Sequence, residues 1–138
     1  MIEVKNYIGG EFLGTSQTLD NSNPATGLVF STVPDSQKDD VDRAVDAAKK
    51  AFPEWSNTTF EERRQWFYKI ADAIDAEAEE LANYETQDNG KTLIMALTVD
   101  IPRASTNFRF FADHSKTRSD DCFDNKDFTN TTRYEPLG

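Results

Sequence analysis

The chain has 138 residues, which is enough for one domain. Its formal net charge of -10 argues against nucleic acid as a partner, because phosphate backbones are bound by clustered lysines and arginines. Hydrophobic residues make up 37%, so either the core is small or apolar faces pack on residues that this sequence lacks. A single cysteine, Cys122, and the absence of both a signal peptide and an apolar run of roughly 20 residues lead us to expect a cytoplasmic protein without membrane contact.

The first third of the sequence is typical of strands and turns. Stretches 4–8 and 11–13 flank Gly9-Gly10, which accepts the positive φ of a tight hairpin loop. The Asn-Pro-Ala-Thr-Gly segment at 23–27 predicts a second turn, and 28–33 is expected to be the returning strand.

Two helices are predicted next. A capping box is expected at Ser36–Asp39, and Pro53 is expected to end the helix whose apolar residues recur at helical spacing: Val41, Ala44, Val45, Ala48 and Phe52. A second capping box is expected at Thr59–Glu62, at the start of a longer helical segment that is interrupted near Ala76 and ends at Asp88-Asn89-Gly90. The apolar face of this segment consists of Phe67, Ile70, Ala71, Ile74, Ala78 and Leu81.

The last third predicts a helix, a loop and a strand. The helix is expected to begin near Asp100 with Pro102 in its first turn, and its apolar face contains Ile101, Ser105, Phe108, Phe111 and Ala112. The acidic stretch 119–127 is expected to be a loop. Residues 128–134 suit a strand with no evident partner nearby, and an unpaired terminal strand invites pairing with another segment or chain.

The residues themselves indicate no self-contained active site. Neighbouring carboxylates disfavour the thiolate of Cys122, and His114 is the only histidine, expected to be a polar residue near a helix C-terminus. No glycine-rich phosphate loop occurs. Composition and spacing alone therefore predict a soluble α+β piece without catalytic machinery.

A series of segments nevertheless follows a known order and spacing: Asn6–Phe12, Asn23–Gly27, Asp40–Val45, Ala47–Phe52, Glu62-Arg63, Ile70–Asp72, Leu81-Ala82, Glu85-Thr86, Asp88–Lys91 and Glu135–Gly138. Together they resemble the amino-terminal part of the aldehyde dehydrogenase superfamily. Asp100–Ala104 with Asn107–Asp113 further resembles the branch that contains the 2-aminomuconate and 2-hydroxymuconate semialdehyde dehydrogenases.

The resemblance implies an α/β fold: N-terminal β-hairpins and long helices of the NAD(P)-binding domain over 1–124, and the start of an oligomerisation β-arm over 125–138. The whole enzyme would be a homo-oligomer, a dimer or tetramer joined through this strand, that oxidises a small-molecule aldehyde with NAD, or NADP. The catalytic domain, with its cysteine, glutamate and asparagine, and the dinucleotide-binding loop would lie beyond Gly138. No catalytic or cofactor-binding residue is therefore assigned here.

Three site residues are implied by the resemblance. Asp88 and the backbone carbonyl of Ser22 would hold a monovalent cation, although Asp88 also suits an ordinary helix stop. Arg103 would bind a substrate carboxylate with its guanidinium fork, the alternative being an ordinary surface arginine. An arginine in a first helical turn opposes the helix dipole, which favours a functional reason for Arg103.

Three interpretations follow. The chain is the N-terminal fragment of a semialdehyde dehydrogenase, inactive alone; or a non-catalytic module that docks its 128–134 strand on a full-length subunit; or an inactive truncated product without a stable fold.

Overall fold

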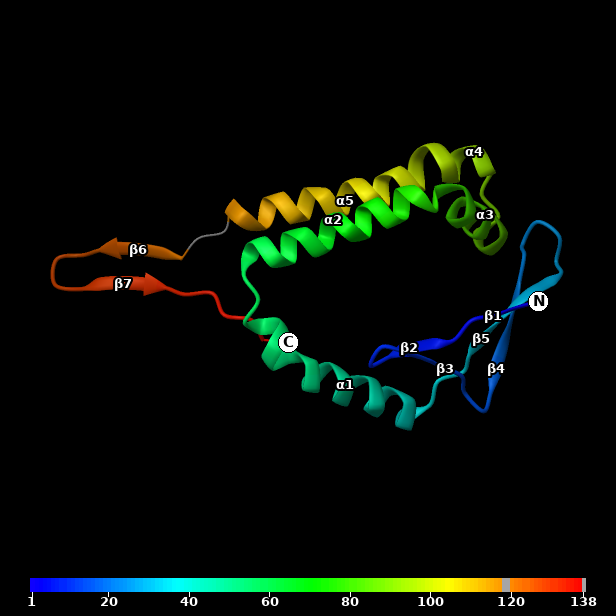
Figure 1. The fold of residues 1–138 in the computed structure, drawn as a ribbon, viewed down its shortest axis with the longest axis horizontal. Coiled ribbons are helices and arrows are strands. Elements are labelled where there is room, and N and C mark those ends of the chain that lie inside the picture. The colour runs from blue at the N-terminus through cyan, green and yellow to red at the C-terminus, as the bar shows by residue number, and fades with distance from the viewer. Residues whose placement is uncertain (118–119, 138) are drawn as a thin grey trace.

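The computed structural model describes residues 1–117 and 120–137. Two long helices, α2 and α5, run side by side, while β2 lies beside α1 and a hairpin of β6 and β7 projects away from the helices (Figure 1). The fold is therefore open and mixed α/β, with separate structural units rather than one closed core.

Five short strands form the first unit: β1 (Ile2–Glu3), β2 (Asn6–Ile8), β3 (Glu11–Leu13), β4 (Thr18–Ser22) and β5 (Val29–Pro34). β2 and β3 form the predicted hairpin, with Gly9 and Gly10 at φ of 63° and 91°. β5 pairs parallel with β1 and antiparallel with β4. The predicted turn between β4 and β5 is confirmed, because the Gly27 N–H donates to the Asn23 carbonyl at 2.8 Å.

α1 (Lys38–Ser56) corrects two expectations. Its capping contact runs from the Gln37 N–H to the Asp40 carboxylate at 2.9 Å, one residue later than predicted, because the Ser36 hydroxyl accepts from the Asn6 amide. Pro53 lies inside the helix and does not end it. It removes one hydrogen bond near the C-terminus, where the last turn is still closed by the Asn57 amide donating to the Pro53 carbonyl at 2.7 Å.

The second predicted stripe is two helices, α2 (Phe60–Ala76) and α3 (Ala78–Asn89). Thr59 and Glu62 form the expected capping box. The break falls at Glu77, one residue after Ala76, and Gly90 ends α3 at φ 77°. These predictions are confirmed.

The predicted start of α5 near Asp100, with Pro102 in its first turn, is confirmed, but helical turns that were not predicted precede it. α4 (Leu93–Met95), a π-helical turn η1 (Ala96–Asp100) and α5 (Ile101–His114) follow one another directly, with Thr92 capping the start. In η1 the Ile101 N–H bonds the Ala96 carbonyl, and this wide turn immediately precedes Pro102, whose missing N–H would interrupt an ordinary ladder. Arg103 therefore lies well inside the helical run, and the helix-dipole argument for its function was wrong.

The C-terminal unit is a hairpin. After a short turn η2 (Ser115–Thr117), β6 (Asp121–Asp124) pairs antiparallel with β7 (Thr129–Thr132). The expected strand is confirmed, but its partner β6 occupies part of the acidic stretch predicted to be a loop, so the loop and the missing partner were wrong; Ser119 lies outside the described residues. β6 and β7 fall on opposite sides of the boundary expected after residue 124.

The core is small, as the composition indicates. Among the described residues, the buried hydrophobic side chains are four alanines, and two serines complete the set: Ala71, Ala82, Ala96, Ala112, Ser31 and Ser105. The principal packing is α2 against α5, where the rings of Phe67 and Phe108 lie 5.6 Å apart. Small residues let the two helices approach closely, but they bury little apolar area.

Candidate functional site

Arg103 lies on α5 with an exposed side chain. Its guanidinium forms no ion pair or hydrogen bond with the part of the chain that the structure describes, whereas each of the other described arginines forms at least one: Arg43, Arg63, Arg64, Arg109 and Arg133. A guanidinium has five donors and always carries its charge, so Arg103 is available for an anionic ligand.

Arg103 shares one face of α5 with three other residues. Asn107, Phe110 and His114 follow Arg103 at helical spacing, and the Phe110 ring stacks on the imidazole of His114 at 5.5 Å. Phe110 is 56% exposed and Phe111 55%, so Phe111 does not join the buried face that the sequence predicted. The arrangement is an aromatic and polar surface with one unpaired cation.

The opposite face of α5 is held on α2 by charged groups. Arg109 Nη2 reaches Asp72 at 2.6 Å and Asp75 at 2.8 Å. Hydrogen bonding from Ser105, together with Arg109, lowers the pKa of Asp75 below its ordinary value. Because these groups bridge two helices, they restrict rotation of α5 and so fix the direction in which Arg103 projects.

A second charged bridge lies further along the same face. Asp113 accepts from Arg64 Nε at 2.9 Å and from the Tyr68 hydroxyl at 2.8 Å. The hydrogen bond from Tyr68, aided by Arg64, lowers the pKa of Asp113. The orientation of α5 therefore rests on bridges spread over its last three turns.

Lys91 connects the end of α3 to η1. Its Nζ lies 2.9 Å from Asp100 Oδ2 and 3.1 Å from Glu85 Oε1, and these two hydrogen bonds, the one to Asp100 foremost, raise the pKa of Lys91. No sequence pattern singles out Lys91, because its contact with Asp100 joins two separate elements and is set by the tertiary structure.

The two residues predicted to hold a cation lie in neighbouring segments. Asp88 Oδ1 accepts from the Asn21 side-chain amide at 2.6 Å, directly beside Ser22. The end of α3 also packs closely on the 23–27 turn, where a Cβ built on Gly90 would lie 2.9 Å from Pro24 Cγ. No cluster of three or more His, Cys, Asp or Glu side chains suited to a metal ion occurs within residues 1–117 and 120–137. A monovalent cation on Asp88 and Ser22 stays a prediction.

Cys122 and His114 do not form a nucleophile and base. Cys122 is exposed on β6, where its Sγ accepts a weak hydrogen bond from the Thr131 hydroxyl at 3.9 Å. His114 is the last residue of α5 and stacks on Phe110. Nucleophilic catalysis requires a base in hydrogen-bonding reach of the thiol, and the contacts of Cys122 include none.

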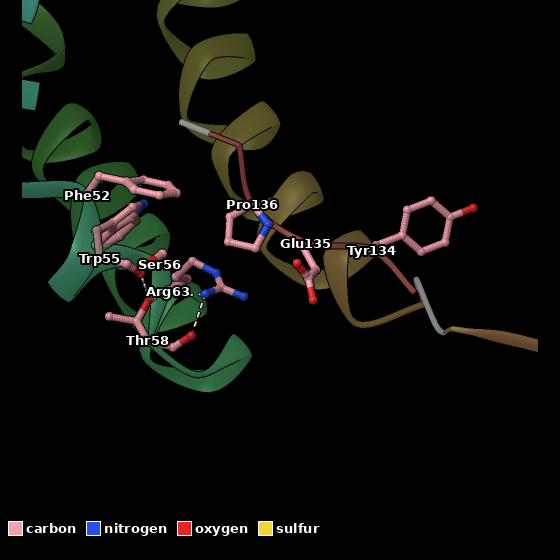
Figure 2. A pocket seen from close by; sticks show the side chains of 8 residues that line it. All are labelled: Phe52, Trp55, Ser56, Thr58, Arg63, Tyr134, Glu135 and Pro136. Carbon is pink, nitrogen blue, oxygen red and sulfur yellow. Dashed lines mark hydrogen bonds between the residues drawn. The ribbon is translucent and has the colours of Figure 1, made fainter. Parts of the chain in front are cut away.

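A cavity of about 440 Å³ that the sequence did not predict lies where residues 134–136 pass the corner between α1 and α2. Figure 2 shows Phe52, Trp55 and Arg63 on one side and Glu135 and Pro136 on the other. Arg63 Nη1 donates to the carbonyl and hydroxyl of Thr58, so its charge helps to hold the corner. The lining contains no pair of groups suited to nucleophilic chemistry.

None of the helices among the described residues combines the length and the apolar character that crossing a bilayer requires.

Comparison with known proteins identifies the fold. Residues 12–138 match the sequence model of the aldehyde dehydrogenase family. The chain is 44% identical over 122 residues to 2-aminomuconic semialdehyde dehydrogenase of Bos taurus, covering 88% of this chain and 25% of that protein. It is 39% identical over 136 residues to acetaldehyde dehydrogenase of Pseudomonas aeruginosa, covering 96% and 27%.

A solved structure agrees with this match. The NAD+ complex of an aldehyde dehydrogenase from Bacillus cereus superimposes with a TM-score of 0.91 at 39% identity, covering 97% of this chain and 28% of that one. The expected fold class, the amino-terminal part of the aldehyde dehydrogenase fold, is thereby confirmed. The chain spans about a quarter of the length of the curated relatives that it matches.

Proposed function

Because this chain belongs to the aldehyde dehydrogenase family, we propose that it supplies the amino-terminal quarter of an enzyme that oxidises an aldehyde to the corresponding acid with NAD. The semialdehyde and acetaldehyde dehydrogenases among its relatives support the reaction, and the NAD+ complex of the B. cereus enzyme supports the cofactor. NADP is the alternative cofactor, and a cytoplasmic location is part of the proposal.

The reaction's catalytic groups are not among the described residues. The described residues include no glycine-rich phosphate loop, so they do not suit the dinucleotide. They also include no cysteine paired with a base, and we therefore assign no chemical step to them. Their role in the proposal is to bind and orient the substrate and to build the scaffold. The 138-residue chain alone is accordingly expected to be inactive.

The preferred substrate in this proposal is an aldehyde that also carries a carboxylate, of the muconic semialdehyde type. The single observation behind it is Arg103, which is exposed and unpaired among the described residues, with Phe110 two helical turns further along the same face of α5. A planar guanidinium matches the two oxygens of a carboxylate, and the exposed rings further along the same helix face suit an unsaturated carbon chain. Several relatives are named for a substrate of this class.

Two further roles belong to the same proposal. Residues 125–138 begin an arm through which subunits pair, and both strands of the β6–β7 hairpin expose nearly every residue. Asp88 and Ser22 hold a monovalent cation between α3 and the 23–27 turn, supported by the contact between Asp88 and Asn21. The exposed hairpin also favours the second candidate, a non-catalytic module that docks on a full-length subunit.

The test of the substrate class is Arg103→Ala in the whole enzyme that contains these residues. We expect KM for succinic semialdehyde to rise strongly, since losing a desolvated charge-assisted pair costs about 2–4 kcal/mol, or about 30- to 1,000-fold. KM for butyraldehyde, a plain aldehyde of the same length, should change less than about threefold. Arg103→Lys, which keeps the charge without the fork, should fall between the two, and equal effects on both aldehydes would refute the role.

A further inference from the structure

Acidic residues precede arginines by three positions at several places on the helices of this chain, and they behave differently. Asp40 and Arg43 on α1 form an ion pair, and so do Glu61 and Arg64 on α2 at 3.6 Å. Asp100 and Arg103 have the same spacing and form none. Because side chains at this spacing are neighbours on a helix, Asp100 is within reach of Arg103 unless another cation holds it.

The partner that Asp100 takes instead is Lys91. The ammonium lies 2.9 Å from Asp100 Oδ2, and the Asp100 side chain is only 25% exposed. Lys91 is held at this position because Gly90 turns the chain at the end of α3 and the Lys91 N–H donates to the Asn89 side chain at 2.9 Å. Glu85 binds the same ammonium at 3.1 Å.

The backbone around Asp100 has an unusual geometry as well. Asp100 is the last residue of η1, and Pro102 follows directly in α5. A π-helical turn changes the angular spacing of side chains relative to an α-helix, and such turns are frequent at functional sites. Asp100 therefore stands where the helical run changes register, beside the end of α3.

We propose that Lys91 is a positioning residue: by binding Asp100 it keeps the guanidinium of Arg103 free for the carboxylate of the substrate. This inference rests on the proposed function of Arg103. In the absence of Lys91, the Asp100 carboxylate competes with the substrate for the same donors. An exposed ion pair at this spacing corresponds to about a two- to fivefold competition in binding, which sets the size of the effect.

The experiment measures KM and kcat for succinic semialdehyde and butyraldehyde in the whole enzyme. Lys91→Met is expected to raise KM for succinic semialdehyde about two- to fivefold, with kcat and the butyraldehyde constants unchanged. Lys91→Arg keeps the charge and should retain the parent KM. The double variant Lys91→Met/Asp100→Asn should restore the parent KM, because the competing carboxylate is gone.

Asp100→Asn alone tests the idea independently of how the Lys91 variants fold. It leaves Arg103 free, so KM for succinic semialdehyde should stay within about twofold of the parent. A rise as large as that of Arg103→Ala would overturn the proposal, as would a Lys91→Met variant that raises KM for both aldehydes or is not rescued by Asp100→Asn.

The two proposals fail in different ways. If Arg103→Ala affects both aldehydes equally, the proposed substrate role is wrong. If Arg103→Ala is selective for succinic semialdehyde but Lys91→Met leaves its KM unchanged, the role of Arg103 stands and only the positioning by Lys91 is wrong.

Discussion

The α2–α5 pair and the β6–β7 hairpin differ in how their contacts are made. The helices bury Ala71 and Ala112 completely and are joined by ion pairs between residues far apart in sequence, such as Arg109 with Asp72. The strands of the hairpin expose every residue except the half-buried Asn130. Its hydrogen bonds run between residues close in sequence, such as Thr129 and Asp124.

The difference indicates which part of the chain has its packing partners within these residues. α2 and α5 pack on each other, so their orientation, and with it the direction of Arg103, is set locally. The hairpin is closed by local hydrogen bonds but has no apolar face covered by the described residues, with Phe123 and Phe128 58% and 72% exposed. An isolated two-stranded hairpin is marginally stable in water, so the arm is the region expected to need another surface.

The largest effect should come from overfilling the contact between the helices. Ala112→Leu places a bulky side chain at a fully buried position on α5. We expect the free energy of unfolding of the chain to fall by about 1–3 kcal/mol, because a close-packed interface resists added volume. Urea unfolding followed by circular dichroism measures it.

The matched control is Ala73→Leu on the exposed side of α2. It adds the same volume where no neighbour resists it, so the change should stay within about 0.5 kcal/mol. Equal losses in the two variants would show that α2 and α5 do not form the close contact described.

A smaller effect is expected from the charged bridge. Arg109→Met leaves Asp72 and Asp75 without their cation, and the melting temperature should fall by about 2–4 °C, since surface pairs contribute modestly. Arg103→Met on the same helix removes an arginine without a described partner, so its melting temperature should not change. An equal fall in both variants would contradict the contrast between these arginines.

The difference between Arg109→Met and the parent chain should depend on pH. The hydrogen bond from Ser105 foremost, and that from Arg109 next, hold the pKa of Asp75 in the folded chain below the ordinary value of 3.8, so both contacts add stability above that value, and Arg109→Met removes only the second. As the pH falls through the lower folded-state pKa, the carboxyl becomes protonated and the contribution is lost. Thermal melts from pH 7 downward should therefore converge for the two proteins.

Local signals predicted the fold well where the relevant contacts are local. The capping box at Thr59 and the glycine at position 90 marked helix ends correctly, because their backbone preferences do not depend on distant residues. Pro53 misled because a proline near a helix end costs only one late hydrogen bond. Pro102 correctly marked the first turn of α5, but it gave no sign of the helical turns that precede α5. β6 was missed because acidic residues rarely form strands when read alone.

The candidate site shows the same division. Arg103 came from a resemblance, and no local pattern distinguishes it from Arg43 or Arg64, which also follow an acid by three positions. Its lack of a partner depends on Lys91, which a turn at Gly90 brings to Asp100. Such a contact between separate elements is set by the tertiary structure, so periodicity could not reveal it.

The smallest effect on the chain itself should come from the arm, where Phe128→Ser removes a large side chain that is 72% exposed. The free energy of unfolding should change by less than about 0.5 kcal/mol, because little buried area is lost. In the whole enzyme the same change should weaken subunit association at least about tenfold, since an aromatic anchor at an interface typically contributes more than 1 kcal/mol. Sedimentation over a concentration series measures the dissociation constant.

Lys126→Ser is the matched control, because Lys126 is exposed in the same turn of the hairpin. A charged residue of this kind at the rim of an interface contributes little to affinity, so association should change less than about threefold. If Phe128→Ser unfolds the isolated chain, the arm is packed on the helices and the contrast between the two regions is wrong. If Phe128→Ser leaves both folding and association unchanged, the Phe128 ring stays exposed to water in the assembled enzyme. The proposed arm then does not join subunits through this residue.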